Sequence, residues 1–241
     1  MELNVLSNKQ EVAKQFSSFL AERIETNTRF TIALSGGSTP KVVFDYLADN
    51  HPQLNWSKVH LFWGDERCVP PDDAESNYKM TVDHLINHIA IPEENIHRIM
   101  GEEDPEKEAI RYGAKLNNHL PETKGIPQFD LVILGMGSDG HTASIFPHEI
   151  DLWDSENNCV VATHPDSGQR RVSLTGKVIN NAKEVAFLVT GEDKREKVSE
   201  ILSRSAVSKN YPASLVNPMY GKLYWFLDEV AYRDRSSRQT T

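Results

Sequence analysis

Short apolar runs of strand character alternate with longer amphipathic segments along this 241-residue chain. A run at residues 3–6 precedes a predicted helix at 9–25, and the run FTIAL at 30–34 precedes a predicted helix at 40–48. In the first helix, apolar residues recur every three or four positions, which places them on one face. Strands that alternate with helices form parallel sheets covered on both faces. We therefore expect an α/β fold with a mostly parallel central sheet flanked by helices.

The rest of the chain continues this alternation. Further strands are predicted in VHLFW, FDLVIL, CVVATH, RRVSLT, EVAFLVTG and KLYWFLD, and further helices at 106–120 and 193–203. The chain contains no internal repeat, low-complexity tract or linker-like stretch. Residues 1–241 are therefore expected to form a single domain.

Four polar loops follow predicted strands at their carboxyl ends. Their sequences are SGGST (35–39), GDER (64–67), GMGSDGH (135–141) and TGEDK (190–194). In open parallel sheets, ligands bind outside the carboxyl ends of the strands, where such loops meet. One glycine loop alone would have a purely steric explanation, because tight turns often need glycine. Four polar loops at the same edge predict a binding site.

The glycines of GMGSDGH have the spacing of a dinucleotide-binding fingerprint, G-x-G-x-x-G. Two features disfavour that interpretation: Pro147 interrupts the helix that should follow Gly140, and no acidic residue ends a strand about 20 residues later. The same loop carries Asp139 and His141. Such a histidine can act as a general base on water while the carboxylate fixes its tautomer. The alternative is structural, with His141 capping the next helix and Asp139 accepting hydrogen bonds from the loop.

The SGGST loop leads into a predicted helix that has Thr39 as its N-cap and Pro40 in its first turn. The loop lacks the lysine of a P-loop. Successive N–H groups at a helix N-terminus nevertheless suit a phosphate monoester. An ordinary capped turn between strand and helix is the alternative.

Cations occur in the other two loops. In GDER, Arg67 can bind a substrate carbonyl or carboxylate, although the residues alone favour a salt bridge to Asp65 or Glu66. Lys194 begins a predicted helix, where a cation opposes the helix dipole. That placement is understandable if an anion lies between the lysine and the helix end.

The formal net charge of −9 argues against nucleic-acid and membrane-surface partners, because both require a basic field. A small anionic ligand is compatible if cations gather locally. Arg170 and Arg171, beside the strand RVSLT, are candidates for such a cluster or are solvated surface residues. The sequence has no secretory leader pattern, no apolar stretch near the roughly 20 residues of a membrane span, and no disulfide framework. These features predict a cytoplasmic protein.

The pair His84 and His88 has a spacing that can bind zinc from one helical face. Its surroundings lack a glutamate base, so a solvated helical face is the favoured interpretation. No metal is expected.

Several motifs appear in a recognisable order from about residue 30 to residue 228: ALSGGSTP, WGDERCVPPDDAESNYKM, LGMGSDGHTASIFP, RVSLT, INNAKEVAFLVTGEDK, PASLV and LYWFLD. In these motifs the chain closely resembles the 6-phosphogluconolactonase family. The resemblance implies a Rossmann-like three-layer sandwich. It also implies hydrolysis of 6-phospho-D-glucono-1,5-lactone to 6-phosphogluconate, in the oxidative pentose phosphate pathway, without a metal or an organic cofactor.

The resemblance further implies roles for individual residues. His141 corresponds to the proposed catalytic base, with Asp139 orienting it, and Arg67 corresponds to an arginine that contacts substrate. The substrate-binding residues that it implies, including those around the phosphate, are Gly36, Gly37, Ser38, Thr39, Asp65, Gly137, Arg171 and Lys194. Arg171 is favoured over Arg170. A monomer or a weak homodimer is expected, with the sugar-phosphate lactone as the small-molecule partner.

Two other functions are compatible with parts of the pattern. Glucosamine-6-phosphate deaminases share SGGSTP and DGH, but there DGH is typically followed by IAFNEP, whose glutamate assists the histidine. Here the segment is TASIFP (142–147), without a glutamate. A non-catalytic sugar-phosphate sensor is expected to carry a DNA-binding segment, which the start of this sequence does not suggest. Because Ser138 and Ser144 lie outside any G-x-S-x-G elbow, an acyl-enzyme is not expected.

Overall fold

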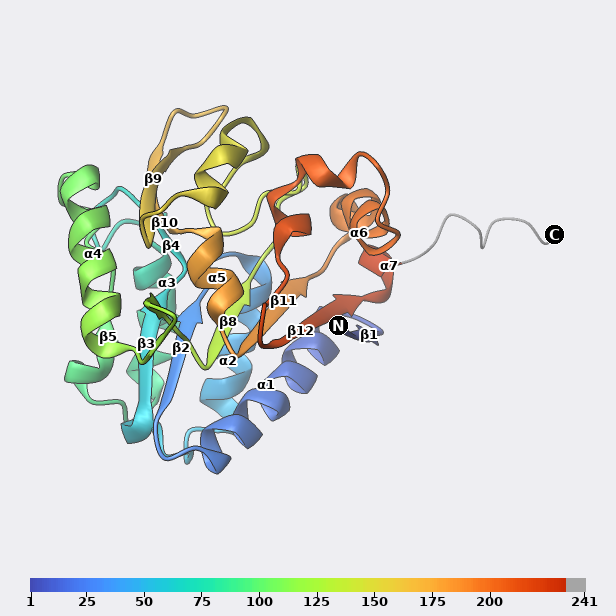
Figure 1. The fold of residues 1–241 in the computed structure, drawn as a ribbon. Coiled ribbons are helices and arrows are strands. Elements are labelled where there is room, and N and C mark those ends of the chain that lie inside the picture. Colours follow the sequence, from blue (N-terminus) through green and yellow to red (C-terminus); the bar gives the residue numbers. More distant parts are fainter. Residues whose placement is uncertain (233–241) are drawn as a thin grey trace.

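The computed structural model describes residues 1–232, and within them seven strands form a parallel sheet in the order β1–β12–β11–β8–β2–β3–β5 (Figure 1). These strands are β1 (Glu2–Leu6), β2 (Phe30–Leu34), β3 (Val59–Trp63), β5 (Ile96–His97), β8 (Leu131–Leu134), β11 (Glu184–Val189) and β12 (Lys222–Asp228). Every residue of β2 and β8 is buried, as expected for central strands with helices on both faces. The expected α/β fold with a mostly parallel central sheet is confirmed.

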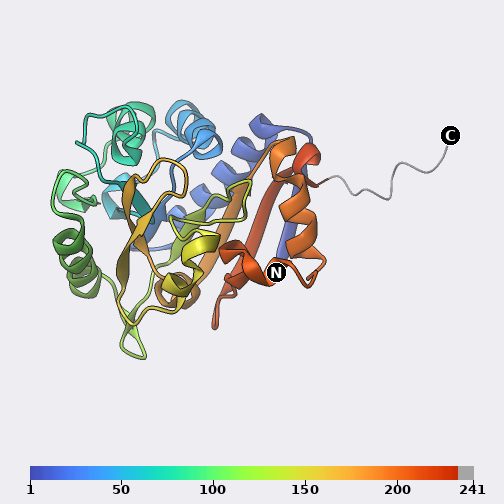
Figure 2. The same ribbon diagram turned by 90° about the horizontal axis from the view of Figure 1, so that it is seen from above.

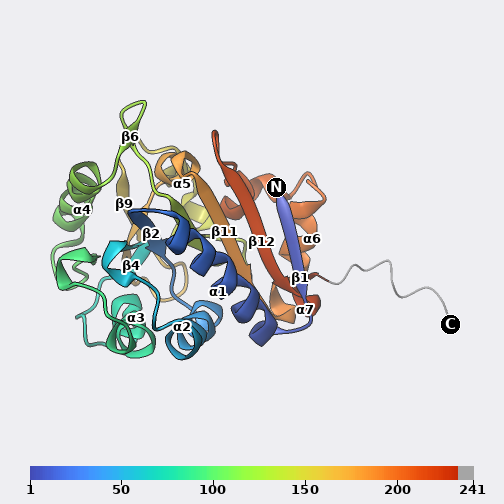
Figure 3. The same cartoon turned by 90° about the horizontal axis from the view of Figure 1, so that it is seen from below.

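Helices form the outer layers of the sandwich. Figures 2 and 3 show α1, α2 and α3 on one face of the sheet and α5 and α6 on the other. Their bounds, together with those of the two remaining helices, are α1 (Lys9–Thr26), α2 (Ser38–Asn50), α3 (Asn77–His84), α4 (Pro105–His119), α5 (Gly176–Asn181), α6 (Arg195–Leu202) and α7 (Glu229–Tyr232). The apolar face predicted for the first helix is buried against the sheet, through Val12, Phe16, Leu20 and Ile24. No helix in residues 1–232 is long and apolar enough to cross a membrane.

A second, antiparallel sheet contains two segments predicted as strands, CVVATH and RRVSLT, and one that was not, GDER. GDER was expected to be a loop, but β4 (Asp65–Arg67) is a strand that pairs with β10 (Arg170–Leu174), which in turn pairs with β9 (Cys159–Thr163). Gly64 joins the two sheets, because its N–H donates to the carbonyl of Leu34 in β2 and its carbonyl accepts from the N–H of Leu174. The residues of GDER therefore have strand geometry. A short hairpin, β6 (Glu122–Thr123) with β7 (Ile126–Pro127), completes the strands of the described chain.

Two predicted helix starts are displaced. The N-cap of α2 is Gly37, not Thr39, and Thr39 lies inside the first turn with its hydroxyl 2.7 Å from that of Thr190. The hydroxyl of Thr39 thus bonds the loop after β11 instead of capping its own helix. The helix predicted at 193–203 begins with a 3-10 turn (Glu192–Lys194) and continues as α6.

The two histidines with zinc-like spacing do not share a helical face. The helix α3 ends at His84, which hydrogen-bonds Asp45, whereas His88 lies in a separate 3-10 turn and contacts the carbonyl of Asp83. Each imidazole therefore has a structural partner of its own.

The hydroxyl of Tyr112 in α4 fixes the end of β3. It accepts a hydrogen bond from the N–H of Trp63 (2.9 Å) and donates one to the carbonyl of the same residue (3.0 Å), in a fully buried position. We expect Tyr112→Phe to lower the free energy of unfolding by about 1–3 kcal/mol, because both backbone groups lose a buried partner. Urea denaturation measures this loss. Tyr46→Phe is the matched control, since the hydroxyl of Tyr46 has no hydrogen-bond partner in residues 1–232. Equal losses in the two variants would contradict this role.

Candidate active site

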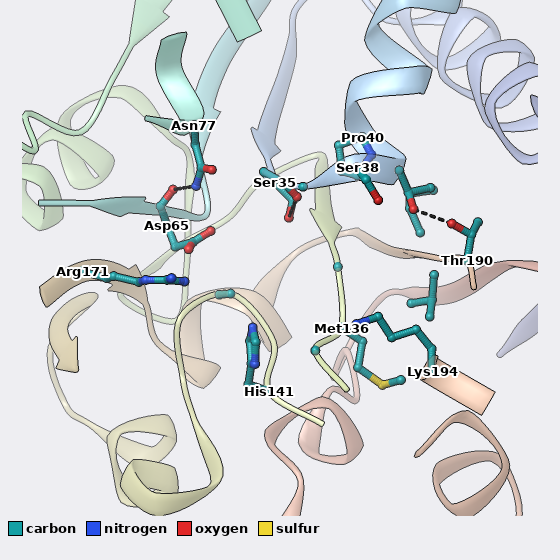
Figure 4. Close-up of a pocket in the computed structure, with 18 of the residues that line it drawn as sticks. Ser35, Ser38, Pro40, Asp65, Asn77, Met136, His141, Arg171, Thr190 and Lys194 are labelled. Atoms are coloured by element: carbon teal, nitrogen blue, oxygen red, sulfur yellow. Dashed lines mark hydrogen bonds between the residues drawn. The ribbon is translucent and has the colours of Figure 1, made fainter. Parts of the chain in front are cut away.

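The four polar segments meet around one cavity of about 240 Å³. They follow β11, β8, β2 and β3, which are consecutive neighbours in the parallel sheet, so their carboxyl ends lie side by side. Figure 4 places Asp65, Asn77 and Arg171 on one side of the cavity and Ser38 and Lys194 on the other, with His141 between them. The residues that line the cavity are Ser35, Gly36, Gly37, Ser38, Thr39, Pro40, Asp65, Arg67, Asn77, Gly135, Met136, Gly137, His141, Ala143, Arg171, Leu188, Val189, Thr190 and Lys194.

His141 and Asp139 form a hydrogen-bonded pair at the edge of this cavity. The Nδ1 atom of His141 lies 2.6 Å from Oδ1 of Asp139, which also accepts the backbone N–H of His141. Burial opposes ionisation of Asp139, but the hydrogen bonds and charge of His141 outweigh it and lower the pKa of Asp139 to about 2. The carboxylate is therefore ionised at neutral pH and can only accept. Nδ1 must then carry the proton, which leaves the Nε2 of neutral His141 as an acceptor.

Two glycines shape the loop around this pair. A methyl group on Gly137 would lie 2.2 Å from Nδ1 of His141 and 2.4 Å from Oδ1 of Asp139, so only glycine leaves room for the two side chains. Gly140 has a φ of +88°, which favours glycine, and it packs against Tyr211. The segment after His141 forms no α-helix, and the next helical residues are a 3-10 stretch that starts at Pro147. The alternative role of His141 as a helix cap is therefore wrong.

The N-terminus of α2 faces the cavity with no side chain capping it. Gly37, at the N-cap, has a φ of +107°, and the first turn contains no acidic residue. The chain approaches closely at Gly36, where an added Cβ would lie 1.8 Å from Oδ1 of Asn77. The backbone N–H groups of Ser38 and Thr39 precede the first i→i−4 bond of the helix, which Lys41 makes to Gly37. This arrangement offers uncompensated donors and the positive end of a helix dipole.

Lys194 enters the cavity from the loop after β11. Its ammonium group pairs with Asp193 at 2.9 Å, and only 22 % of its side chain is exposed. The neighbouring Thr190 ties this loop to the α2 N-terminus through the hydroxyl of Thr39. The lysine and the helix N-terminus therefore border the same part of the cavity, as Figure 4 shows.

Arg67 and Arg171 are directly opposite each other on β4 and β10. Burial lowers the pKa of Arg171, the charge of Arg67 adds to this effect, and Asp65 opposes it. Like charges that face each other across a strand pair destabilise it. An anion in the cavity would relieve this repulsion. Arg170 points elsewhere and pairs with Glu106, so the structure places Arg171, not Arg170, at the cavity.

The salt bridge favoured from the sequence for Arg67 is not formed. Arg67 makes no ion pair with Asp65 or Glu66; its guanidinium donates to the carbonyl of Glu75, and its Nε is buried without a hydrogen-bond partner in residues 1–232. Glu66 instead turns away from the cavity and accepts the N–H groups of Asn77 and Tyr78 at the start of α3. Its position in the interior makes Glu66 a structural residue.

Sequence reasoning missed several residues at or behind the cavity. Asn77 lines the cavity and donates from Nδ2 to the carbonyl of Asp65. Ser144 lies behind the lining and donates its hydroxyl to Oδ2 of Asp65 at 2.5 Å. Met136 and Thr190 also line the space. The segment NYKM (77–80) was used only as part of a family motif. No local pattern in the sequence indicates that the side chain of Asn77 lies against Gly36.

Comparisons with known proteins place the chain in a family. The model of the family described as glucosamine-6-phosphate isomerases/6-phosphogluconolactonase matches residues 7–225, and the chain belongs to this family. It is 48% identical over 204 residues to a 6-phosphogluconolactonase of Haemophilus influenzae, which covers 84% of this chain and 86% of the relative. A 6-phosphogluconolactonase of Treponema pallidum is 44% identical over 204 residues, covering 84% and 85% of the two chains. The solved 6-phosphogluconolactonase of Trypanosoma brucei superposes with a TM-score of 0.87 at 32% identity, over 95% and 97% of the chains.

We expect Gly137→Ala to separate His141 from Asp139, since the new methyl group needs the space that both side chains occupy. The side-chain ¹H–¹⁵N spectrum of His141 measures this directly, because the Nδ1 proton bound to a carboxylate resonates far downfield. The signal should be lost in Gly137→Ala. Gly135→Ala is the matched control, because the nearest atom to its added Cβ is 3.6 Å away. A signal that persists in Gly137→Ala would show that the loop accommodates the methyl group.

Proposed function

We propose that this chain hydrolyses 6-phospho-D-glucono-1,5-lactone to 6-phospho-D-gluconate. The observation that carries the proposal is a histidine imidazole, held by a hydrogen bond to an ionised carboxylate, at a cavity that also holds three cations and a helix N-terminus. The names of the relatives support the same reaction. The equipment suits a lactone that carries a phosphate.

The phosphate binds at the uncapped N-terminus of α2. The N–H groups of Gly37, Ser38 and Thr39 and the ammonium group of Lys194 supply donors and positive charge. Arg171 adds positive charge from across the cavity. A dianionic phosphate at this end of the cavity also compensates an unfavourable feature of the site, the lysine at a helix start. Anchoring the phosphate positions the lactone carbonyl near His141.

His141 acts as a general base. Its Nε2 takes a proton from water while the water oxygen forms a bond to C1 of the lactone, and the carbonyl π electrons move to oxygen. Arg67, or an N–H group of the 135–140 loop, donates to this oxyanion. When the oxyanion collapses, the C1–O5 bond breaks and imidazolium returns its proton to O5. Asp139 stabilises the imidazolium between these steps.

This equipment matches the difficulty of the reaction. A positioned base contributes about 10²–10⁴-fold, and an oxyanion donor roughly 10²–10³-fold. A six-membered lactone already hydrolyses in water, so no covalent nucleophile is needed. Ser144 is fully buried and donates its hydroxyl to Asp65, which supports a structural role for it. The proposed chemistry uses only side chains and water, so it requires neither a metal nor a cofactor.

We further propose that residues 1–241 work as one domain, as a monomer or weak homodimer in the cytoplasm. Pairing of β1 with β12 supports the single domain, because strands from the two ends of the described chain lie side by side in one sheet. The net charge of −9 supports a protein that works without nucleic acid or an anionic membrane surface.

The function is tested by hydrolysis of freshly generated 6-phosphogluconolactone in a pH-stat, corrected for spontaneous hydrolysis. We expect rapid proton release in that assay and no ammonia from glucosamine 6-phosphate. Ammonia release without lactone hydrolysis would replace the proposal by a deaminase.

His141→Ala is expected to lower kcat by at least about 10²-fold with little change in substrate affinity, because the base is lost while the phosphate contacts stay. Steady-state kinetics with the phosphorylated lactone measure both quantities. His148→Ala is the control, since His148 lies a few residues further on and 45% of its side chain is exposed. Turnover near the wild-type value in His141→Ala would remove this residue from the base role.

Lys194→Ala is expected to raise KM for the phosphorylated lactone by roughly 10–100-fold, the range for loss of one charge-assisted hydrogen bond. The same variant should hydrolyse unphosphorylated glucono-1,5-lactone almost as the wild type does. Comparing kcat/KM for the two lactones isolates the phosphate contact. Equal losses on both substrates would contradict it.

A further inference from the structure

A second cavity, of about 630 Å³, lies between the end of α6, the segment at 204–218 and the first residues of β12. Figure 1 shows this segment returning from α6 to the start of β12. The cavity shares no lining residue with the site around His141. The proposed hydrolysis does not use it.

Two polar groups at this cavity lack partners. Trp225 is 1% exposed, and its Nε1–H finds no hydrogen-bond acceptor in residues 1–232. The hydroxyl of Ser205 is likewise buried and unpaired in that part of the chain. Both residues border the cavity. A buried polar group without a partner is unfavourable, so a ligand oxygen that reaches one of these donors through a small side-chain movement would gain a hydrogen bond that the described chain leaves unmade.

The charge of the cavity lining has one sign. No Asp or Glu lines it, although the chain carries 35 acidic residues against 26 basic ones. Arg204 and Lys209 are both exposed at the cavity, and neither forms an ion pair within the described residues. Arg204 also has a φ of +54°, a left-handed position that usually holds glycine after a helix. Because the charged side chains that line the cavity, Arg204 and Lys209, are both cationic, the cavity favours an anion.

The other lining residues are mixed: Ser208, Ser214 and Asn217 are polar, and Ile201, Leu215, Val216, Leu223 and Trp225 give the cavity an apolar part. We propose that this cavity is a second binding site, for a small organic anion with an apolar body, such as an aryl or short acyl carboxylate or sulfonate. Its anionic group lies at Arg204 and Lys209, an oxygen accepts from Trp225 or Ser205, and its apolar part covers the leucines and valine.

The wall of this cavity also holds the catalytic loop. Ala213 lines the cavity, and its N–H donates to the carbonyl of Gly140 at 3.0 Å. Tyr211, on the same segment, packs against Gly140. Gly140 lies between Asp139 and His141, so a ligand that displaces this segment also displaces the backbone between these two residues. The second site is therefore coupled to the first through one hydrogen bond and one packing contact.

The probe 8-anilinonaphthalene-1-sulfonate tests the site, because it combines a sulfonate with aromatic rings and fluoresces when bound. We expect saturable binding that saturating 6-phosphogluconate does not displace. Lys209→Glu should weaken binding at least tenfold, and Ser205→Val should also weaken it. Lys107→Glu, an exposed lysine on α4 with the same change of charge, should not. Basal lactonase activity should be unchanged in Lys209→Glu, and thermal melts should show that each variant is folded.

Three results would overturn the proposal: no saturable binding, displacement by 6-phosphogluconate, or equal affinity in Lys209→Glu and Lys107→Glu. The coupling has its own readout in the backbone amide resonance of Gly140. Saturating probe should shift it in the wild type, and in Lys209→Glu the shift should be smaller at the same probe concentration, in proportion to the lower occupancy. An unshifted resonance in the saturated wild type would refute the coupling. Because binding of the probe does not depend on turnover, its failure is distinguishable from failure of the proposed hydrolysis.

Discussion

Backbone hydrogen bonding between β11, β8, β2 and β3 is the constraint on which the site depends. Parallel pairing in this order brings four carboxyl ends to one edge of the sheet, although the segments that follow them are up to about 150 residues apart in sequence. Every residue of β2 and β8 is buried, so close packing on both faces of the sheet holds these two strands in place. The loops that follow these strands are therefore held in fixed positions. The hydroxyl contact between Thr39 and Thr190 then locks two of them together.

The charges that line the cavity favour an anionic ligand, although the chain as a whole is acidic. Three cations and one carboxylate line the space, whereas the whole sequence has a net charge of −9. The structure places these cations in unfavourable positions: Lys194 beside a helix start, and Arg67 opposite Arg171. Such placements cost stability unless an anion binds. The pair formed by His141 and Asp139 does not depend on these cations. When the imidazole is protonated, the carboxylate of Asp139 balances its charge directly. Binding and proton transfer therefore use different groups.

The elements that sequence reasoning predicted well have local causes. The strand at 30–34 and the first helix follow from apolar periodicity, which burial on one or both faces imposes directly. The contact between Asp139 and His141 was also predictable, since the residues are two apart on a glycine turn. The N-cap of α2 was not predictable, because the hydroxyl of Thr39 can either cap its own helix or bond another loop. It bonds Thr190, which is distant in sequence. GDER was misjudged as a loop for the same reason: its pairing partner, β10, lies about 100 residues further along the chain.

By itself, the sequence determined that this chain forms a parallel α/β sheet and that polar loops with a histidine–carboxylate pair follow its strands. These are consequences of local spacing, which propensity and periodicity encode. Only the tertiary structure decided which charges face one another. It put Arg171 opposite Arg67, turned Glu66 into the interior to hold α3, and brought Asn77 beneath Gly36. Those outcomes depend on strand order and on how chain crossovers pack, and contacts between residues distant in sequence leave no periodic trace in it.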